Sequence, residues 1–407
     1  MPLPAGLRAL ASRDFRVYFA GTLVSQVGNW MQTVTQSWLV LELTHSPFLL
    51  GLIATLQFGP ILLFSIFGGI LADRVRKRNV LMVTQSVQAI LALGLGLLVL
   101  THHARYWTVA VMAVMWGVMS ALDQPTRQSF IVELVGRPLL PSAVGLNSAS
   151  FNSARILGPS VAGILIARVG LFAAFLLNAL AFLVSIAALT RVPGRPPASR
   201  ATRTPVLEEI AEGVAYVART PPVWFILGLQ IIVSFCVFNF SVYVPLLAKV
   251  LGLGSEGFGF LMACLGVGAV TAGLSLGALA GSREPPPGVI AVALGLACAG
   301  LLGLAVARSF WLAASLMVLV GLTGTLVVAG CNTSLQLAAP DRLRGRVMSL
   351  YTLVSGGIFP VSAFSVGAVS EAAGVSRAFA VNGSLGLVAL GLLLWSRRRR
   401  RRRPGGA

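Results

Sequence analysis

The stretch "GGILADRVRKRN", Gly68 to Asn79, ends a long apolar run and follows it with one acid and four bases. The run before it, at about 48–72, is long enough to cross a bilayer as a helix. Similar runs recur on both sides of it along the 407 residues, of which 56% are hydrophobic and 11% are charged. Because soluble globular proteins carry about 25% charged residues, the composition excludes that class. We interpret the stretch as a loop between two membrane spans.

The apolar runs predict an all-α membrane protein with twelve transmembrane helices. Backbone polar groups in hydrocarbon must be hydrogen-bonded within their own segment, which favours helices, and the alternating pattern of a barrel strand is absent. We expect the spans at about 15–42, 48–72, 79–101, 106–127, 142–168, 171–190, 222–247, 257–280, 287–306, 310–336, 347–371 and 375–396. The first is too long and too polar for a cleaved signal peptide.

The longest polar interruption, at about 191–221, divides the chain into two six-helix halves. We therefore predict an N-terminal half at 1–190, a cytoplasmic linker at 191–221, a C-terminal half at 222–396 and a basic tail at 397–407. The linker begins with prolines that interrupt helices. It continues as "VLEEIAEGVAYVART", whose apolar residues at three- and four-residue spacing predict a short amphipathic helix along the membrane face.

The net charge of +19 is explained by topology. The bases gather in alternate loops and in both termini, and the intervening loops carry one each. By the positive-inside rule both termini are cytoplasmic, in the cytoplasmic (inner) membrane. The arginine tail is then a topological anchor attracted to anionic lipid head groups. The alternative, a nucleic-acid-binding tail, has no support from the other bases.

Four sequence blocks point to a known family. The pattern G-x-L-A-D-R-x-x-K-R from Gly69 to Arg78 resembles the loop 2–3 signature of the major facilitator superfamily, except that Arg76 stands where the signature has glycine. With "DFRVYFAGTLVSQVGNWMQTVTQSWLVLELT", "NSARILGP" and "PDRLRGRVMSLYTL", the chain is similar to the branch of efflux permeases that includes the bacterial enterobactin exporter. The resemblance implies two bundles that alternate access to a central site.

The resemblance also implies a gate. It places Asp73 against the N-terminal end of the eleventh helix, near 347–349, where a carboxylate is favoured. Gly69 would allow close helix packing, and Arg74 and Arg78 would add ionic contacts. The alternative is that the bases only set topology and Asp73 offsets them.

The fifth span combines export and coupling signals. Gly158 and Pro159 partly match the antiporter signature of the superfamily, which accompanies export and gives a bent, closely packed helix. Arg155, one turn earlier, is a base inside a span and is therefore a functional candidate. We expect its partner to be Asp123, either as a proton- or substrate-sensitive pair or as a static one. Asp123 and Glu42 are the candidate proton carriers.

Polar side chains in three spans predict a central ligand site. Amides and hydroxyls cannot face hydrocarbon unpaired, and amides beside aromatic rings suit an amphiphilic ligand. The alternative is that these amides are hydrogen bonds between helices. The candidate binding residues are Gln26, Asn29, Trp30, Thr33 and Gln36 in span one, Asn152 and Arg155 in span five, and Gln230, Ser234, Phe238 and Asn239 in span seven.

The sequence lacks the residue patterns typical of nucleotide-binding, metal-binding and catalytic sites. Neither lysine has phosphate-loop spacing, the four cysteines show no paired spacing, and the three histidines lie in loops. We therefore expect no cofactor, no metal and no enzyme activity. The hypothesis is a proton-coupled secondary exporter of siderophore- or drug-type amphiphiles that works as a monomer in the lipid bilayer. An importer of the same fold and a non-transporting membrane receptor are the alternatives.

Overall fold

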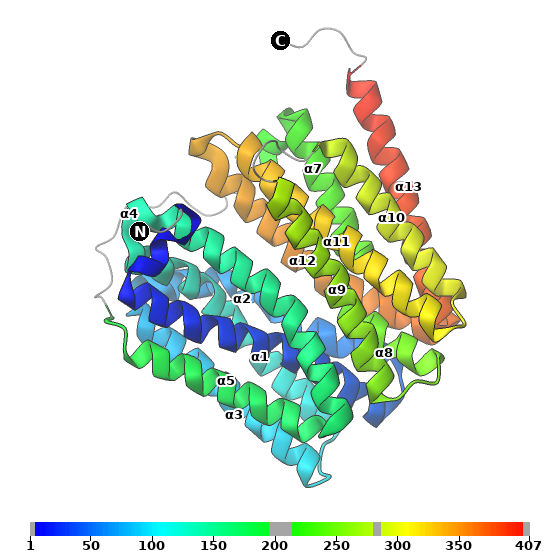
Figure 1. Ribbon diagram of the computed structural model, residues 1–407, viewed down its shortest axis with the longest axis horizontal. Helices are drawn as coiled ribbons and strands as arrows, with labels where there is room; N and C mark the ends of the chain where they lie inside the picture. The colour runs from blue at the N-terminus through cyan, green and yellow to red at the C-terminus, as the bar shows by residue number, and fades with distance from the viewer. Residues whose placement is uncertain (1–4, 195–213, 280–285, 402–407) are drawn as a thin grey trace. The chain divides into compact units, whose positions relative to one another are not determined.

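The computed structural model describes residues 5–194, 214–279 and 286–401, and these residues form helices joined by short connections (Figure 1). Within them, ten helices are long and apolar enough to cross a membrane. The spans predicted at 15–42 and 142–168 are helical but are not among the ten. The first carries the polar stripe, which lowers its hydropathy. The prediction of an all-α membrane protein is confirmed.

The N-terminal helices begin and end within a few residues of the predicted spans. They are η1 (Ala5–Ala11), α1 (Arg13–Thr44), α2 (Pro47–Arg74), α3 (Lys77–Leu100), α4 (Tyr106–Arg168) and α5 (Leu171–Thr190). Ser12 caps α1, since its side chain accepts a hydrogen bond from the backbone N–H of Phe15.

Helix α4 contains two predicted spans in one helical element. At Gly136 the backbone leaves helical geometry, with φ 68° and ψ 175°. A positive φ of this kind strains residues that carry a Cβ, so glycine is needed at the turn. The loop expected between 127 and 142 is therefore mostly helical, with a kink at this one residue.

The C-terminal helices include one span that is broken. They are α7 (Pro221–Ile232), η2 (Val233–Val237), α8 (Phe240–Val250), α9 (Ser255–Leu279), α10 (Pro287–Val306), α11 (Phe310–Ala338), α12 (Asp341–Ala373) and α13 (Val375–Arg401). The span predicted at 222–247 is thus α7, a π-helical turn and α8. The linker helix is helical at 214–219, while 206–213 lies outside the described residues.

The chain groups into two compact units. Unit 1 comprises Met1–Arg200 with Leu253–Ala263, and unit 2 comprises Ala201–Gly252 with Cys264–Ala407. The first turns of α9 group with unit 1 because Phe258 stacks on Trp38, with ring centroids 4.6 Å apart. A Cβ on Gly163 would lie 2.2 Å from the Cα of Gly259, so these backbones are in direct contact.

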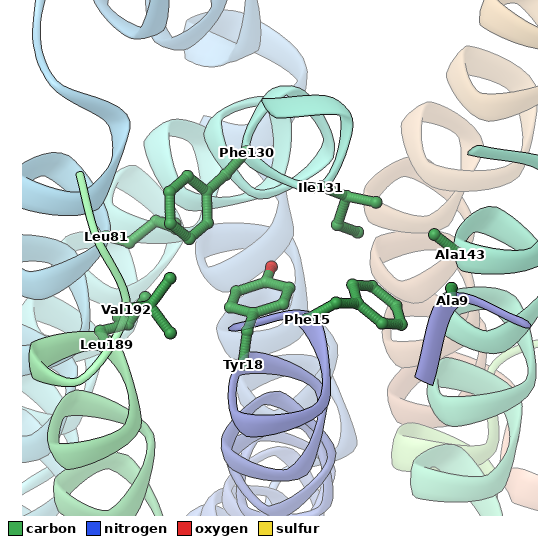
Figure 2. Close-up of a cluster of buried hydrophobic side chains, with 9 residues drawn as sticks. All are labelled: Ala9, Phe15, Tyr18, Leu81, Phe130, Ile131, Ala143, Leu189 and Val192. Atoms are coloured by element: carbon green, nitrogen blue, oxygen red, sulfur yellow. The ribbon is translucent and has the colours of Figure 1, made fainter. Parts of the chain in front are cut away.

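A buried apolar cluster holds one end of unit 1 together (Figure 2). Its members come from η1, α1, α3, α4 and the end of α5, and they are Ala9, Phe15, Tyr18, Leu81, Phe130, Ile131, Ala143, Leu189 and Val192. The ring of Tyr18 meets that of Phe130 edge to face, with centroids 5.3 Å apart. The backbone N–H of Ala9 also donates to Ser142 Oγ at 3.0 Å, which ties η1 to α4.

Candidate transport site

The polar stripe of α1 contacts α2 through a glutamine pair. Gln36 Nε2 donates to Gln57 Oε1 at 3.3 Å, and Gln57 Nε2 donates to Thr33 Oγ1 at 3.4 Å. All three side chains are buried. Gln57 is a polar residue inside an apolar span, which is the signal by which sequence reasoning could have found it.

Two further amides of α1 hydrogen-bond to neighbouring helices of unit 1. Asn29 Oδ1 accepts from Trp116 Nε1 of α4 at 3.1 Å, and Gln32 Oε1 accepts from Asn178 Nδ2 of α5 at 3.0 Å. Trp116 and Asn178 were not among the predicted site residues. The observed contacts of Asn29, Thr33 and Gln36 are therefore hydrogen bonds between helices, which was the alternative to ligand binding.

Trp30, next to Asn29 in α1, contacts the part of α4 that follows Gly136. Its ring meets Phe151 edge to face at 5.9 Å, and the Arg155 guanidinium lies 5.5 Å from the ring centroid. The Trp30 Nε1 and Gln26 Oε1 atoms are buried and have no hydrogen-bond partner among the described residues. Asn152 is on the same helical stretch, but its side chain lies outside the described residues.

At Gly158 the backbone of α4 packs closely against α1. A Cβ there would lie 2.6 Å from Trp30 Cβ and 2.7 Å from the Val27 carbonyl oxygen. Pro159 follows and is buried. The small residue predicted for tight packing therefore holds the Trp30 ring and Arg155 at a fixed spacing.

Asp123 does not take the partner that the sequence suggested. Its Oδ2 accepts from Arg127 Nε at 2.9 Å and from Arg127 Nη2 at 2.7 Å, and its Oδ1 accepts from Thr84 Oγ1 at 2.9 Å. The predicted Asp123–Arg155 pair is therefore corrected to Asp123–Arg127. The physical reason is local, since residues four apart on a helix lie on one face, and Arg155 is instead beside Trp30.

The other charged candidates lie near helix ends. Glu42 is exposed at the end of α1, and its Oε1 accepts from Trp38 Nε1 at 2.6 Å. Arg78 Nη2 donates to the carbonyl oxygen of Thr190 at the end of α5, at 3.3 Å. Lys77 pairs with Glu133 of α4 at 3.1 Å, a contact that the sequence analysis missed.

The remaining gate residues belong to the signature loop. The backbone of α2 is helical through Gly69, Asp73 and Arg74, and their side chains lie outside the described residues. The gate therefore stays a prediction.

In unit 2, Gln230 is the centre of a buried hydrogen-bond group. Its Nε2 donates to Ser234 Oγ at 3.0 Å and to Ser355 Oγ of α12 at 2.9 Å. Its Oε1 is buried and has no hydrogen-bond partner among the described residues.

Asn239 stabilises the break that follows η2. Its Nδ2 donates to the carbonyl oxygen of Phe235 at 3.1 Å and also to Ser362 Oγ, and that hydroxyl in turn donates to the same carbonyl. A π-helical turn leaves backbone carbonyls without their usual partners, and such turns recur at functional sites. Phe238 lies at the break with its ring edge to face on Phe240, at 5.0 Å.

Comparison with known proteins agrees with this architecture. A family model described as a transmembrane secretion effector of the major facilitator superfamily matches residues 5–402. The chain belongs to that family. It is a membrane transporter.

Two curated relatives have named substrates. The chain is 26% identical over 344 residues to the enterobactin exporter of Shigella boydii serotype 4 (strain Sb227), which covers 83% of this chain and 80% of that protein. It is 27% identical over 172 residues to the staphyloferrin A transporter of Staphylococcus aureus (strain NCTC 8325 / PS 47). That second match spans only 42% of this chain and 43% of the relative.

Solved structures confirm the fold. A bacterial homolog of the human lysosomal transporter Spinster, in an inward-facing and occupied conformation, superposes with a TM-score of 0.74 at 14% identity and covers 94% of this transporter and 96% of that chain. A peptide-bound POT family transporter gives a TM-score of 0.70 at 14% identity, covering 94% and 95%.

Proposed function

We propose that this transporter exports small amphiphilic molecules of the siderophore type, driven by protons. The enterobactin exporter, similar over four fifths of both chains, supports the direction and the chemical class. The family fold supports alternating access. We also propose that the protein works as a monomer. Both termini are placed in the cytoplasm, which the distribution of bases favours.

The observation that supports this class of substrate is the cluster formed by Trp30, Phe151 and Arg155, called here the Trp30 cluster. A guanidinium 5.5 Å from the centre of an indole ring, with Phe151 beside it, offers both a positive charge and aromatic surface. Arginine stacks on planar rings and pairs with anionic oxygens. These groups suit a ligand that is aromatic and anionic, such as a catecholate. Trp30, Phe151 and Arg155 are the binding residues we propose for unit 1.

For unit 2 we propose Gln230, Ser234, Phe238 and Asn239 as ligand contacts. Gln230 Oε1 and Asn239 Oδ1 are buried acceptors without a hydrogen-bond partner among the described residues. Burying such an atom costs free energy unless it is paired. Ligand hydroxyls would supply the missing donors.

We propose that Asp123 carries the coupled proton and that Arg127 is its ion-pair partner. Glu42 is the second candidate for the proton carrier. Protonation of Asp123 would remove the charge that holds Arg127 at 2.7 Å. A buried cation without its partner is unfavourable, so protonation would favour rearrangement of α4. This gives the carboxylate a way to link protons to helix movement.

Transport into everted membrane vesicles tests the proposal, with enterobactin as the probe. For an exporter, enterobactin should accumulate when the vesicle interior is acidified, and a protonophore should abolish accumulation. Arg155→Ala and Trp30→Ala should each reduce uptake at least tenfold. Arg168→Ala is the matched control, because Arg168 is exposed at the end of the same helix.

Other outcomes separate the alternatives. Accumulation only in right-side-out vesicles would indicate the importer. Saturable binding without flux would indicate the receptor. Full uptake by both variants would contradict the Trp30 cluster as the binding site.

A further inference from the structure

The outward face of α13 carries an apolar stripe that ends in an aromatic ring and a base. Val388, Leu392 and Trp395 are 60%, 61% and 53% exposed, and their three- and four-residue spacing puts them on one helix face. In a membrane protein such a stripe faces lipid. Tryptophan marks the level of the head groups, so the stripe reaches the interface at Trp395.

The arginine run continues this helix. Helix α13 extends to Arg401, and its end projects past α7 and α10 in Figure 1. Arg399, one turn after Trp395 and on the same face, lies with its guanidinium carbon 3.8 Å from the centre of that ring. The base is therefore held on the lipid-facing side, one turn beyond the interface ring.

A second arginine is held on a different side of the helix, because residues two apart do not share a face. The Arg397 guanidinium carbon lies 4.1 Å from the ring centre of Phe225, in the first turns of α7. The two helices are in tight contact below it, since a Cβ on Gly228 would lie 2.8 Å from Leu393 Cδ1. Arg398, between the two held arginines, is exposed.

Consecutive arginines on a helix repel one another. Positions 397 and 401 of α13 are both arginine and stand four residues apart, and like charges at this spacing destabilise a helix, although the C-terminal position favours cations. Counter-charges from the membrane surface would offset this repulsion at the depth where Trp395 places it.

We propose that Arg397, Arg398 and Arg399, with Trp395, form a docking surface for the phosphate groups of anionic phospholipids. The aromatic contacts orient the guanidinium groups before the lipid binds. One guanidinium can then donate two parallel hydrogen bonds to two oxygens of a phosphate. This surface differs from a general attraction of a basic tail, because two of its bases have fixed positions. It is independent of the substrate proposal and is tested without transport.

The experiment measures lipid bound to the purified full-length transporter in mixed micelles. Phosphatidylglycerol is compared with phosphatidylcholine of the same chains, and bound lipid is counted by native mass spectrometry. The test variant is Arg397→Gln/Arg398→Gln/Arg399→Gln. The matched control, Lys249→Gln/Arg308→Gln/Arg377→Gln, removes three exposed bases, at the end of α8, before α11 and in the first turn of α13, and changes the net charge equally.

The wild type and the control should bind phosphatidylglycerol at least tenfold more tightly than phosphatidylcholine. The test variant should bind it more weakly by roughly fivefold for each arginine replaced. Thermal melting and gel filtration show whether the variant folds. A salt titration of the wild-type protein gives a second measurement, because screening should weaken binding as salt rises.

Several results would overturn the proposal. Equal binding of the two lipids by the wild type would exclude a charge-selective surface. Equal losses in the test and control variants would show a net-charge effect. Displacement of the lipid by millimolar glycerol phosphate would indicate a site for soluble anions, and stronger binding of an oligonucleotide would indicate nucleic acid.

Discussion

The carboxylate of Asp123 is buried, and Arg127 and Thr84 both donate hydrogen bonds to it. Removing one partner of a buried ion pair costs about 3–5 kcal/mol. Asp123→Asn should therefore lower the free energy of unfolding by about 3 kcal/mol. A double-mutant cycle measured by chemical unfolding should give a large coupling energy with Arg127→Gln and almost none with Arg155→Gln. The opposite order would restore the pairing first expected from the sequence.

Gly158 gives a second prediction at a single residue. Its Cβ would lie 2.6 Å from Trp30 Cβ and 2.7 Å from the Val27 carbonyl oxygen, whereas nothing lies within 4 Å of a Cβ on Gly145 of the same helix. Overpacking costs about 1–3 kcal/mol, while alanine stabilises an open helix position by about 1 kcal/mol over glycine. Gly158→Ala should lower the melting temperature and Gly145→Ala should leave it unchanged or raise it. Equal shifts would contradict the close contact.

Residue types were predictable from the sequence, but most of their partners were not. The polar stripe of α1 was visible as amides inside an apolar span, yet its partners Gln57, Trp116 and Asn178 are set by how the helices pack. Arg127 could have been found, because it stands four residues after Asp123. Choosing Arg155 overlooked this local rule.

At the scale of an element, the break after η2 depends on two side chains. Asn239 and Ser362 both donate to the carbonyl oxygen of Phe235. Losing a hydrogen bond to a buried carbonyl costs about 1–3 kcal/mol. Asn239→Ala and Ser362→Ala should each speed hydrogen exchange of the amides at 233–240, as followed by mass spectrometry.

The control for this experiment is Ser315→Ala. The Ser315 hydroxyl is exposed and donates only within its own helix, to the Trp311 carbonyl oxygen at 2.9 Å. Its loss should leave exchange at 233–240 unchanged. If the two test variants also leave it unchanged, the side chains do not stabilise the break.

The helices themselves were largely predictable, because span length follows from the thickness of the bilayer. Most predicted ends agree with α1 to α13 within a few residues. Two features were missed. A kink at Gly136 stands where a loop was expected, and its signal was a glycine two residues before Pro138. The π-helical turn at Val233–Val237 contains neither glycine nor proline, so tertiary contacts rather than local sequence produce it.

At the scale of the whole molecule, the placement of charge predicts which loops face the cytoplasm. The two ends of α3 are a matched pair. Its start adjoins Arg74, Arg76, Lys77 and Arg78, whereas the loop after its end carries Arg105 as its one base. A helix of 24 residues at 1.5 Å per residue spans the hydrocarbon core, so these ends lie on opposite sides of the membrane. The positive-inside rule assigns the first to the cytoplasm.

Cysteine labelling with a membrane-impermeant maleimide tests this assignment. Cys236, Cys298 and Cys331 are buried, so replacing Cys264 with serine leaves a background that should react little. In that background, His103→Cys should be labelled in intact cells, because His103 is exposed after the end of α3. Arg76→Cys, at the exposed start, should be labelled only after permeabilisation. The reverse pattern would invert the topology and place the arginine-rich end of α13 outside the cell, and labelling of both in intact cells would show that α3 does not cross the membrane.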